Sequence, residues 1–92
     1  MQQGENLLAM YIFARVVEQQ SFSHAAKILG ISTASVSREI VALEKRLAMK
    51  LLHRTTRKVT VTECGQQYYR YCERISAQLE NAEDFIRQMH SQ

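Results

Sequence analysis

Residues 23–47 read SHAAKILGISTASVSREIVALEKRL, two helical patterns separated by a single glycine. Ser23 is placed to cap the first pattern, HAAKIL, because a serine hydroxyl accepts a hydrogen bond from a free N–H at a helix start. Gly30 follows, and glycine readily adopts the left-handed conformation that ends a helix. Ser32 is the expected cap of the next helix. Two helices joined by so short a turn predict a helix-turn-helix.

The helix that starts after Ser32 has an apolar face and a polar face. Its inward stripe consists of Val36, Ile40, Leu43 and Leu47. The residues left facing outward are Thr33, Ala34, Ser37 and Arg38. Small side chains let the positive end of a helix approach a phosphate, hydroxyls bond to phosphates and base edges, and arginine can bond guanine at two atoms. This pattern predicts DNA contact, and a simple cluster of capping serines is the alternative.

Downstream, residues 51–61 (LLHRTTRKVTV) change from helical to alternating periodicity. Two short strands around Arg54 to Lys58 therefore form a predicted hairpin, or wing, although its tip lacks an Asn-Gly or Asp-Gly pair. Its expected DNA-contacting side chains are Arg54, Thr55, Arg57 and Lys58. Arginine is attracted into a narrow minor groove, while lysine and threonine suit the flanking phosphates, so the wing is predicted to hold DNA beside the major groove.

Positive charge is concentrated in the middle of the chain. Residues 31–62 hold seven basic and two acidic side chains, a balance of +5, whereas the whole chain carries a formal net charge of +3. Such asymmetry favours a surface that binds a polyanion, with a solvated basic helix flank as the alternative.

Two further helices are predicted on either side of this region. Residues 6–19 place Met10, Phe13, Ala14 and Val17 on one face and Leu8, Ile12 and Val16 on a second apolar line. Thr62 is the expected cap of a long helix over residues 63–90, with Glu63 in its first turn. A heptad-like stripe runs along that helix through Tyr68, Cys72, Ile75, Leu79, Ala82, Ile86 and Met89. The stripe predicts pairing of two chains; an ordinary core helix would explain only its first two turns.

Other classes of protein have little support. Cys64 and Cys72 are eight residues apart in one helix, too far for a disulfide, and the three histidines have no metal-ligand spacing. We expect free thiols, no metal and no cofactor. Neither a paired catalytic constellation nor a phosphate-binding glycine loop is visible, so an enzyme is not expected. No apolar run is long enough to span a bilayer and no signal peptide is recognisable, so a soluble cytoplasmic protein is expected.

The motifs together resemble the N-terminal DNA-binding domain and linker helix of the LysR-type transcriptional regulators. The resemblance covers VVEQQSFSHAAKILGISTASVSREIVALEKRL (residues 16–47), LLHRTTRKVTVTECG (residues 51–65) and the long helix. It implies a mainly α winged helix-turn-helix of three helices and a two-stranded wing in residues 1–61, and a linker or dimerisation helix in residues 62–92.

The resemblance also implies a function, namely binding of a homodimer to an interrupted palindrome in double-stranded DNA. It places Ser32, Thr33, Ala34, Ser37 and Arg38 at the major groove, Ser23 near a phosphate, and Arg54 and Arg57 on the wing. Many members have glutamine where this chain has Thr33, and threonine cannot make the bidentate contact of an amide. Family proteins carry a further effector-sensing domain, so the chain is interpreted as a DNA-binding fragment that binds no small-molecule effector itself.

Two other binding functions compete with this reading. In an interaction module, the stripe of the long helix would be the functional surface and the helix-turn-helix only a scaffold. RNA binding is the second competitor, but no aromatic residue for base stacking occurs between Ile31 and Thr62.

Overall fold

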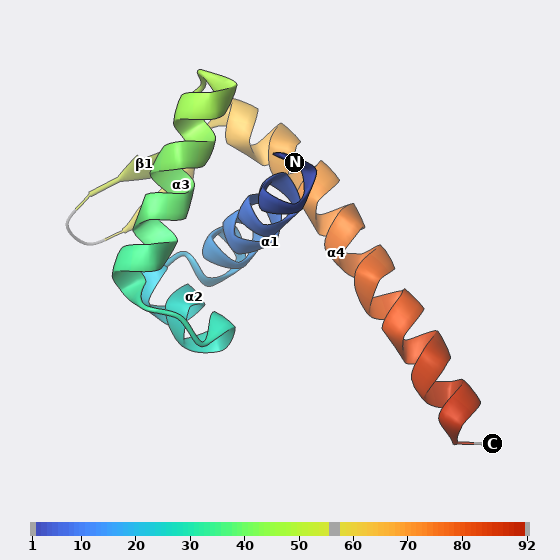
Figure 1. The fold of residues 1–92 in the computed structure, drawn as a ribbon. Helices are drawn as coiled ribbons and strands as arrows, with labels where there is room; N and C mark the ends of the chain where they lie inside the picture. The colour runs from blue at the N-terminus through green and yellow to red at the C-terminus, as the bar shows by residue number, and fades with distance from the viewer. Residues whose placement is uncertain (1, 56–57, 92) are drawn as a thin grey trace.

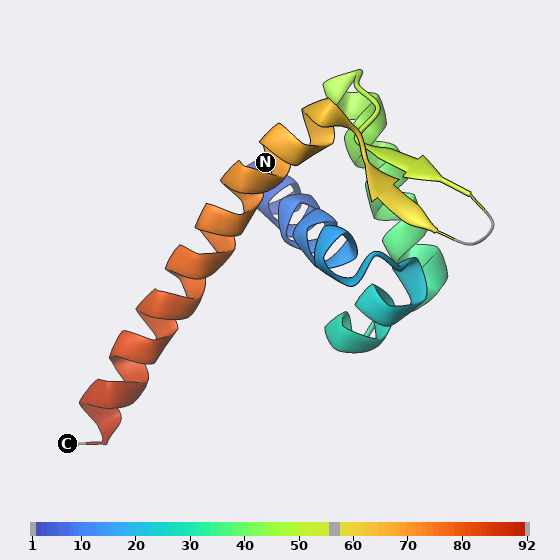
Figure 2. The same cartoon turned by 180° about the vertical axis from the view of Figure 1, so that it is seen from behind.

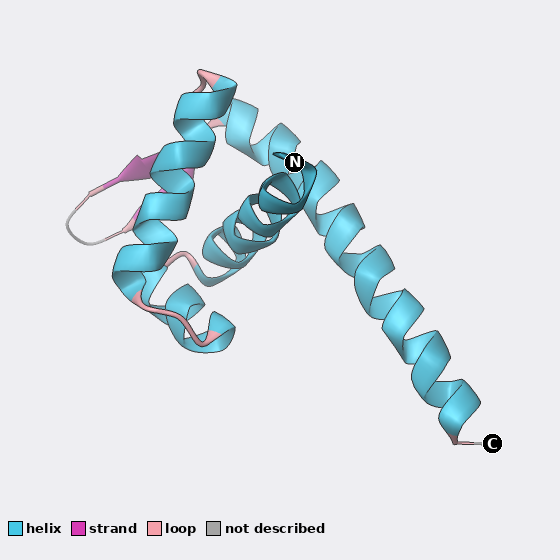
Figure 3. Ribbon diagram, viewed as in Figure 1, coloured by secondary structure: helices cyan, strands magenta, loops and turns pink. Residues whose placement is uncertain are grey.

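The computed structural model describes residues 2–55 and 58–91 (Figure 1). The elements in chain order are α1 (Gln2–Gln19), α2 (Phe22–Leu29), α3 (Thr33–Leu47), β1 (Leu52–Arg54), β2 (Val59–Val61) and α4 (Glu63–His90). Helices dominate, and the two strands form a small projecting hairpin (Figure 3). This arrangement confirms the predicted winged helix-turn-helix followed by a long helix.

Helix α1 provides the centre of the core and packs against α2, α3 and α4. Phe13, Ala14 and Val16 are fully buried, as their helical spacing predicted. The helix starts at Gln2, four residues before the predicted start at Asn6. Leu8 was expected on an apolar line, yet it is 53% exposed, because none of the other residues that the structure describes covers this part of α1.

The helix-turn-helix is formed by α2, the turn at Gly30 and α3. Ser21, in extended conformation, caps α2 by accepting a hydrogen bond from the His24 N–H at 3.1 Å. The prediction that Ser23 is this cap was wrong: α2 begins at Phe22, so Ser23 already lies inside its first turn. Gly30 ends α2 with a φ of 72°, and Ser32 caps α3, both as predicted.

The stripe of α3 holds this helix against the core. Val36, Ile40 and Leu43 are buried, and Leu47 packs at the edge. At its C-terminal end, the Glu44 carboxylate accepts hydrogen bonds from the N–H groups of Leu51 and Leu52, at 2.8 and 3.0 Å. This pair of bonds fastens the start of the wing to the last turns of α3.

The wing is the predicted antiparallel hairpin. Leu52 pairs with Val61, and Arg54 pairs with Val59. Toward the tip, the Thr55 N–H donates to the Lys58 carbonyl at 2.9 Å, and the Lys58 N–H donates to the Thr55 hydroxyl at 3.0 Å. These two bonds hold the two strands together near the tip, where the sequence has no Asn-Gly turn. Arg57, a predicted contact residue, lies outside the described residues.

Helix α4 begins with Thr62 as its cap and extends away from the other helices (Figure 2). Its first turns belong to the core: Cys72 is buried, and the rings of Tyr68 and Phe13 are 5.5 Å apart. Burial raises the pKa of the Cys72 thiol to about 11, so the thiol stays neutral at ordinary pH. Tyr69 joins α4 to α1 by donating a hydrogen bond to Glu18 at 2.8 Å.

Candidate nucleic-acid interface

The N-terminal face of α3 presents its short polar side chains to solvent. Ser32, Thr33, Ala34 and Arg38 are exposed, while Ser37 is half-buried. Val36 and Ile40 face the opposite way into the core. The structure thus places all five predicted α3 contact residues at or beside an accessible helix end, where the free N–H groups of the first turn favour a phosphate.

A chain of hydrogen bonds along this face orients Arg38. Ser32 accepts from the Ser35 N–H at 3.0 Å and donates to the Ser35 hydroxyl at 2.9 Å. The Arg38 guanidinium in turn donates to the Ser35 hydroxyl at 3.1 Å. Ser32 therefore works mainly as the cap, and Ser35, which sequence reasoning missed, supports Arg38. The spacing of three residues between each pair was the available signal.

Residues from α2, α3 and the wing converge on one surface cleft of about 370 Å³. Four predicted contact residues line it: Ser23, Thr33, Thr55 and Lys58. Among the described residues that line the cleft there is no carboxylate. Three elements that are separate in the sequence therefore share a hollow in which hydroxyl groups and the Lys58 cation lie beside apolar side chains, without an acidic group among the described lining residues.

Arg54 connects the wing to both helices of the helix-turn-helix. Its guanidinium carbon lies 4.4 Å from the centre of the Phe22 ring, and its terminal nitrogen lies 3.5 Å from the Ser37 hydroxyl. Sequence reasoning missed Phe22 as a neighbour of this arginine. Within residues 2–55 and 58–91, the ion pairs are Arg15–Glu18 and Arg87–Asp84. The cations of this face are thus not neutralised by those carboxylates.

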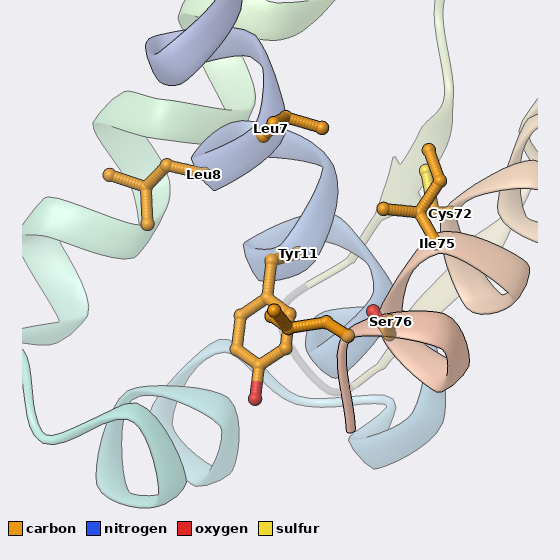
Figure 4. Close-up of a pocket in the computed structure, with 7 residues that line it drawn as sticks. Leu7, Leu8, Tyr11, Cys72, Ile75 and Ser76 are labelled. Carbon is orange, nitrogen blue, oxygen red and sulfur yellow. The ribbon is translucent and has the colours of Figure 1, made fainter. Parts of the chain in front are cut away.

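A second surface, which we call the apolar groove, lies between α1 and α4 (Figure 4). It measures about 300 Å³ and is lined by Leu7, Leu8, Tyr11, Cys72, Ile75, Ser76 and Leu79. Of the predicted dimerisation residues, Tyr68 and Cys72 belong to the core of the chain itself. The exposed members of the stripe are Ile75, Leu79, Ala82, Ile86 and Met89. The part of the stripe that is accessible therefore begins at Ile75.

Two other kinds of site are absent from residues 2–55 and 58–91. No helix there combines the length and apolar character needed to cross a membrane. Likewise, this part of the chain has no group of three or more histidine, cysteine or acidic side chains placed to hold a metal ion.

Comparison with known proteins identifies the family. Residues 7–66 match the lysR family of bacterial regulatory helix-turn-helix proteins. An HTH-type transcriptional regulator of Xanthomonas campestris pv. campestris is 49% identical over 80 residues, which cover 87% of this chain and 23% of that protein. The HTH-type transcriptional regulator CrgA of Neisseria meningitidis is 42% identical over 79 residues, covering 86% of this chain and 26% of CrgA. The chain thus spans about a quarter of the length of these relatives.

Solved structures of DNA complexes have the same fold. The DNA-binding domain of BenM, bound to catB site 1 DNA, has a TM-score of 0.80 and 32% identity, covering 94% of this chain and 96% of that domain. The DNA-binding domain of CbnR in a DNA complex has a TM-score of 0.77 and 28% identity, covering 90% and 95%. With its fold, its polar α3 face and these relatives in agreement, the chain belongs to the LysR family of bacterial transcriptional regulators, as a helix-turn-helix DNA-binding domain.

Proposed function

We propose that this chain binds double-stranded DNA in a sequence-specific manner as a homodimer. In this proposal α3 enters the major groove, the wing lies at the adjacent minor groove, and the two α4 helices hold the dimer together. Residues 1–61 thus contact DNA, while residues 62–92 pair the chains. In the whole regulator, this unit would direct transcriptional control to particular promoters.

The observation that carries the proposal is the convergence of the predicted contact residues on one face. Thr33 of α3, Ser23 of α2 and Lys58 of the wing line the same cleft. Arg54 reaches from the wing toward Ser37 of α3. A duplex that meets the end of α3 would therefore also meet the wing, and the two contacts would reinforce one another.

The side chains of this face differ in whether they suit contacts with bases or with phosphates. Arg38 is oriented by Ser35 and is long enough to reach the paired acceptors of guanine. The methyl group of the exposed Ala34 suits an apolar contact with a thymine methyl. Ser23 and Lys58 instead suit phosphates, which fix the register of the protein without carrying sequence information.

The dimer part of the proposal rests on apolar surface that the chain itself leaves uncovered. Leu79, Ile86 and Met89 on α4 are 52%, 53% and 51% exposed. A second copy would cover this stripe and the apolar groove beside it. In a two-fold pair, the two α3 helices would lie about 34 Å apart, which is one turn of DNA. Such a pair would require two half-sites in the duplex.

Selection of bound sequences from a random duplex pool by the purified 92-residue chain tests this function. We expect a two-fold symmetric consensus whose half-sites are about one helical turn apart. A consensus with a single half-site would contradict the dimer. Recovery of unenriched, random sequences would contradict sequence-specific binding and favour an interaction module with the helix-turn-helix as a scaffold.

A further inference from the structure

Arg54 is a wing residue whose side chain contacts both helices of the helix-turn-helix, α2 and α3. It ends β1, where its backbone pairs with Val59. The guanidinium carbon lies 4.4 Å from the centroid of the Phe22 ring at the start of α2. A terminal nitrogen of the same group lies 3.5 Å from the hydroxyl of Ser37 on α3. The arginine therefore spans the space between the wing and the helix-turn-helix.

Phe22 provides a firm support for this cation. The residue is half-buried and packs against the core, directly after Ser21, whose hydroxyl caps α2. An aromatic ring attracts a guanidinium through its electron-rich face and leaves the positive charge in place. A carboxylate at the same position would have neutralised that charge, and neither ion pair of the described residues includes Arg54.

Holding an arginine in place favours DNA binding because a free arginine side chain loses conformational freedom when it is immobilised. The contact with Phe22 restricts the Arg54 side chain before the duplex binds, so less conformational freedom is lost on binding. The contact to Ser37 also fixes the distance between the guanidinium and α3, since Ser37 lies on the same helix as Arg38. The wing and the recognition helix are then presented as one unit.

We propose that Phe22 is a positioning residue for DNA binding, whose ring holds the Arg54 guanidinium beside α3 in the orientation that the duplex requires. The inference rests on the proposed function and adds a residue that acts through Arg54. The competing explanation is that Phe22 only fills space in the core. The two explanations differ in one respect: positioning operates solely through Arg54, whereas packing does not.

A double-mutant cycle distinguishes them, using the 92-residue chain and a labelled duplex of the consensus selected by the wild-type protein. Phe22→Leu keeps an apolar side chain but removes the ring, and Phe22→Tyr keeps the ring. We expect Phe22→Leu to weaken binding about three- to fivefold, the range of a partly exposed cation–ring contact. Phe22→Tyr should stay within about twofold of wild type. In an Arg54→Ala background, Phe22→Leu should change the affinity by less than about twofold.

Equal losses from Phe22→Leu with and without Arg54 would overturn the inference, since the ring would then act through packing alone. Circular dichroism and thermal unfolding show whether each variant is folded. Should Phe22→Leu fail to fold, NMR of the free wild-type chain tests the ring–guanidinium contact on which positioning depends, because a ring beneath a guanidinium shields the neighbouring protons. Upfield-shifted Arg54 δ and ε protons are expected, and ordinary shifts would refute the contact.

The outcome for the proposed function is read separately. If wild type binds consensus and scrambled duplexes equally, sequence-specific binding fails. If it discriminates between them while the cycle shows no coupling, only the role of Phe22 fails.

Discussion

At the scale of single residues, Ser35 is the link between the structure of α3 and its proposed chemistry. It bonds both to the cap residue Ser32 and to the guanidinium of Arg38. The same hydroxyl that accepts a hydrogen bond from the cap residue also limits the directions in which Arg38 can point. The bond to the cap of α3 and the orientation of Arg38, the proposed base-reading group, therefore involve one side chain.

Arg38 and Lys58 should respond differently to removal. We expect Arg38→Ala to cost about 1 to 3 kcal/mol on the selected duplex and to relax sequence preference, because it loses paired bonds to a base. Lys58→Ala should weaken all duplexes alike and reduce the salt slope by about one, because it loses a phosphate contact. Affinities for selected and scrambled duplexes at several salt concentrations measure both effects. Equal losses for both variants on both duplexes would contradict this division.

The residue-level predictions succeeded where helical periodicity alone decides exposure, as for Thr33 and Arg38. They failed for Phe22, whose partner Arg54 approaches only after the wing has folded back on α2. They also failed in choosing between Ser21 and Ser23 as the cap of α2. Both serines suit a cap, and the choice depends on Phe22 joining the helix as its first residue, a matter of tertiary packing.

At the scale of elements, the junction between the wing and α4 is held by several short contacts. The Leu51 carbonyl accepts a hydrogen bond from the Thr62 N–H at 3.0 Å, and the Thr62 hydroxyl donates to the Lys50 carbonyl at 2.8 Å, with the Leu51 carbonyl at 3.2 Å. The Thr62 hydroxyl also caps α4 by accepting from the Gly65 N–H at 2.9 Å. A Cβ on Gly65 would collide with the Leu51 carbonyl oxygen and crowd Val61. Glycine is therefore required for the close approach of α4 to β1.

Gly65→Ala should destabilise the fold by about 1 to 3 kcal/mol, because backbone atoms would have to move apart. For a domain of this size, that loss lowers the melting temperature by about 4 to 8 °C for each kcal/mol. Gly4→Ala is the matched control, since no atom lies within 4 Å of its added Cβ. Thermal unfolding at equal protein concentrations compares the two variants. A melting temperature for Gly65→Ala equal to that of wild type would show that the junction is looser than its contacts indicate.

Elements were predicted well where the sequence carries local signals at their ends. Thr62 and Gly30 marked helix boundaries correctly because both act within one turn of the chain. The start of α1 was misplaced because residues 1–5 contain no serine, threonine, aspartate or asparagine to act as a cap. The wing was recognised from its alternating pattern. The hydrogen bond between the Lys58 N–H and the Thr55 hydroxyl depends on side-chain geometry, and no sequence motif predicts it.

At the scale of the whole molecule, α4 has two environments along its length. Near Cys72 it is part of the core, whereas from Ile75 onward its stripe faces solvent in a single chain. The periodicity of the stripe was readable from the sequence. The small size of the domain also indicated that only the first turns of the stripe could be core, whereas the crossing with α1 that covers Cys72 depends on tertiary packing.

Leu79→Glu tests the proposed pairing of two chains. A charge in the middle of an apolar interface is costly to bury, so sedimentation should shift from dimer toward monomer. Gln78→Glu is a suitable control because it adds the same charge at an exposed neighbouring position outside the stripe. An unchanged dimer mass for Leu79→Glu would show that Leu79 of α4 is not part of the interface. Sequence-specific binding by a single domain would then be tested separately.

Helix α4 is held closely at its first turn, so a change in its angle there would move its distant C-terminal end. Its 28 residues form a rod about 42 Å long, anchored at one end by the Thr62–Leu51 bonds. Because α4 also packs against α1 as far as Ser76, only residues 77–90 extend past the core, and a tilt of about 5° would displace the far end of this 14-residue stretch by about 2 Å. In the proposed pair, the distance between the two α3 helices would therefore depend on the angle at which α4 leaves the domain. Thr62 and Gly65 help to set that angle.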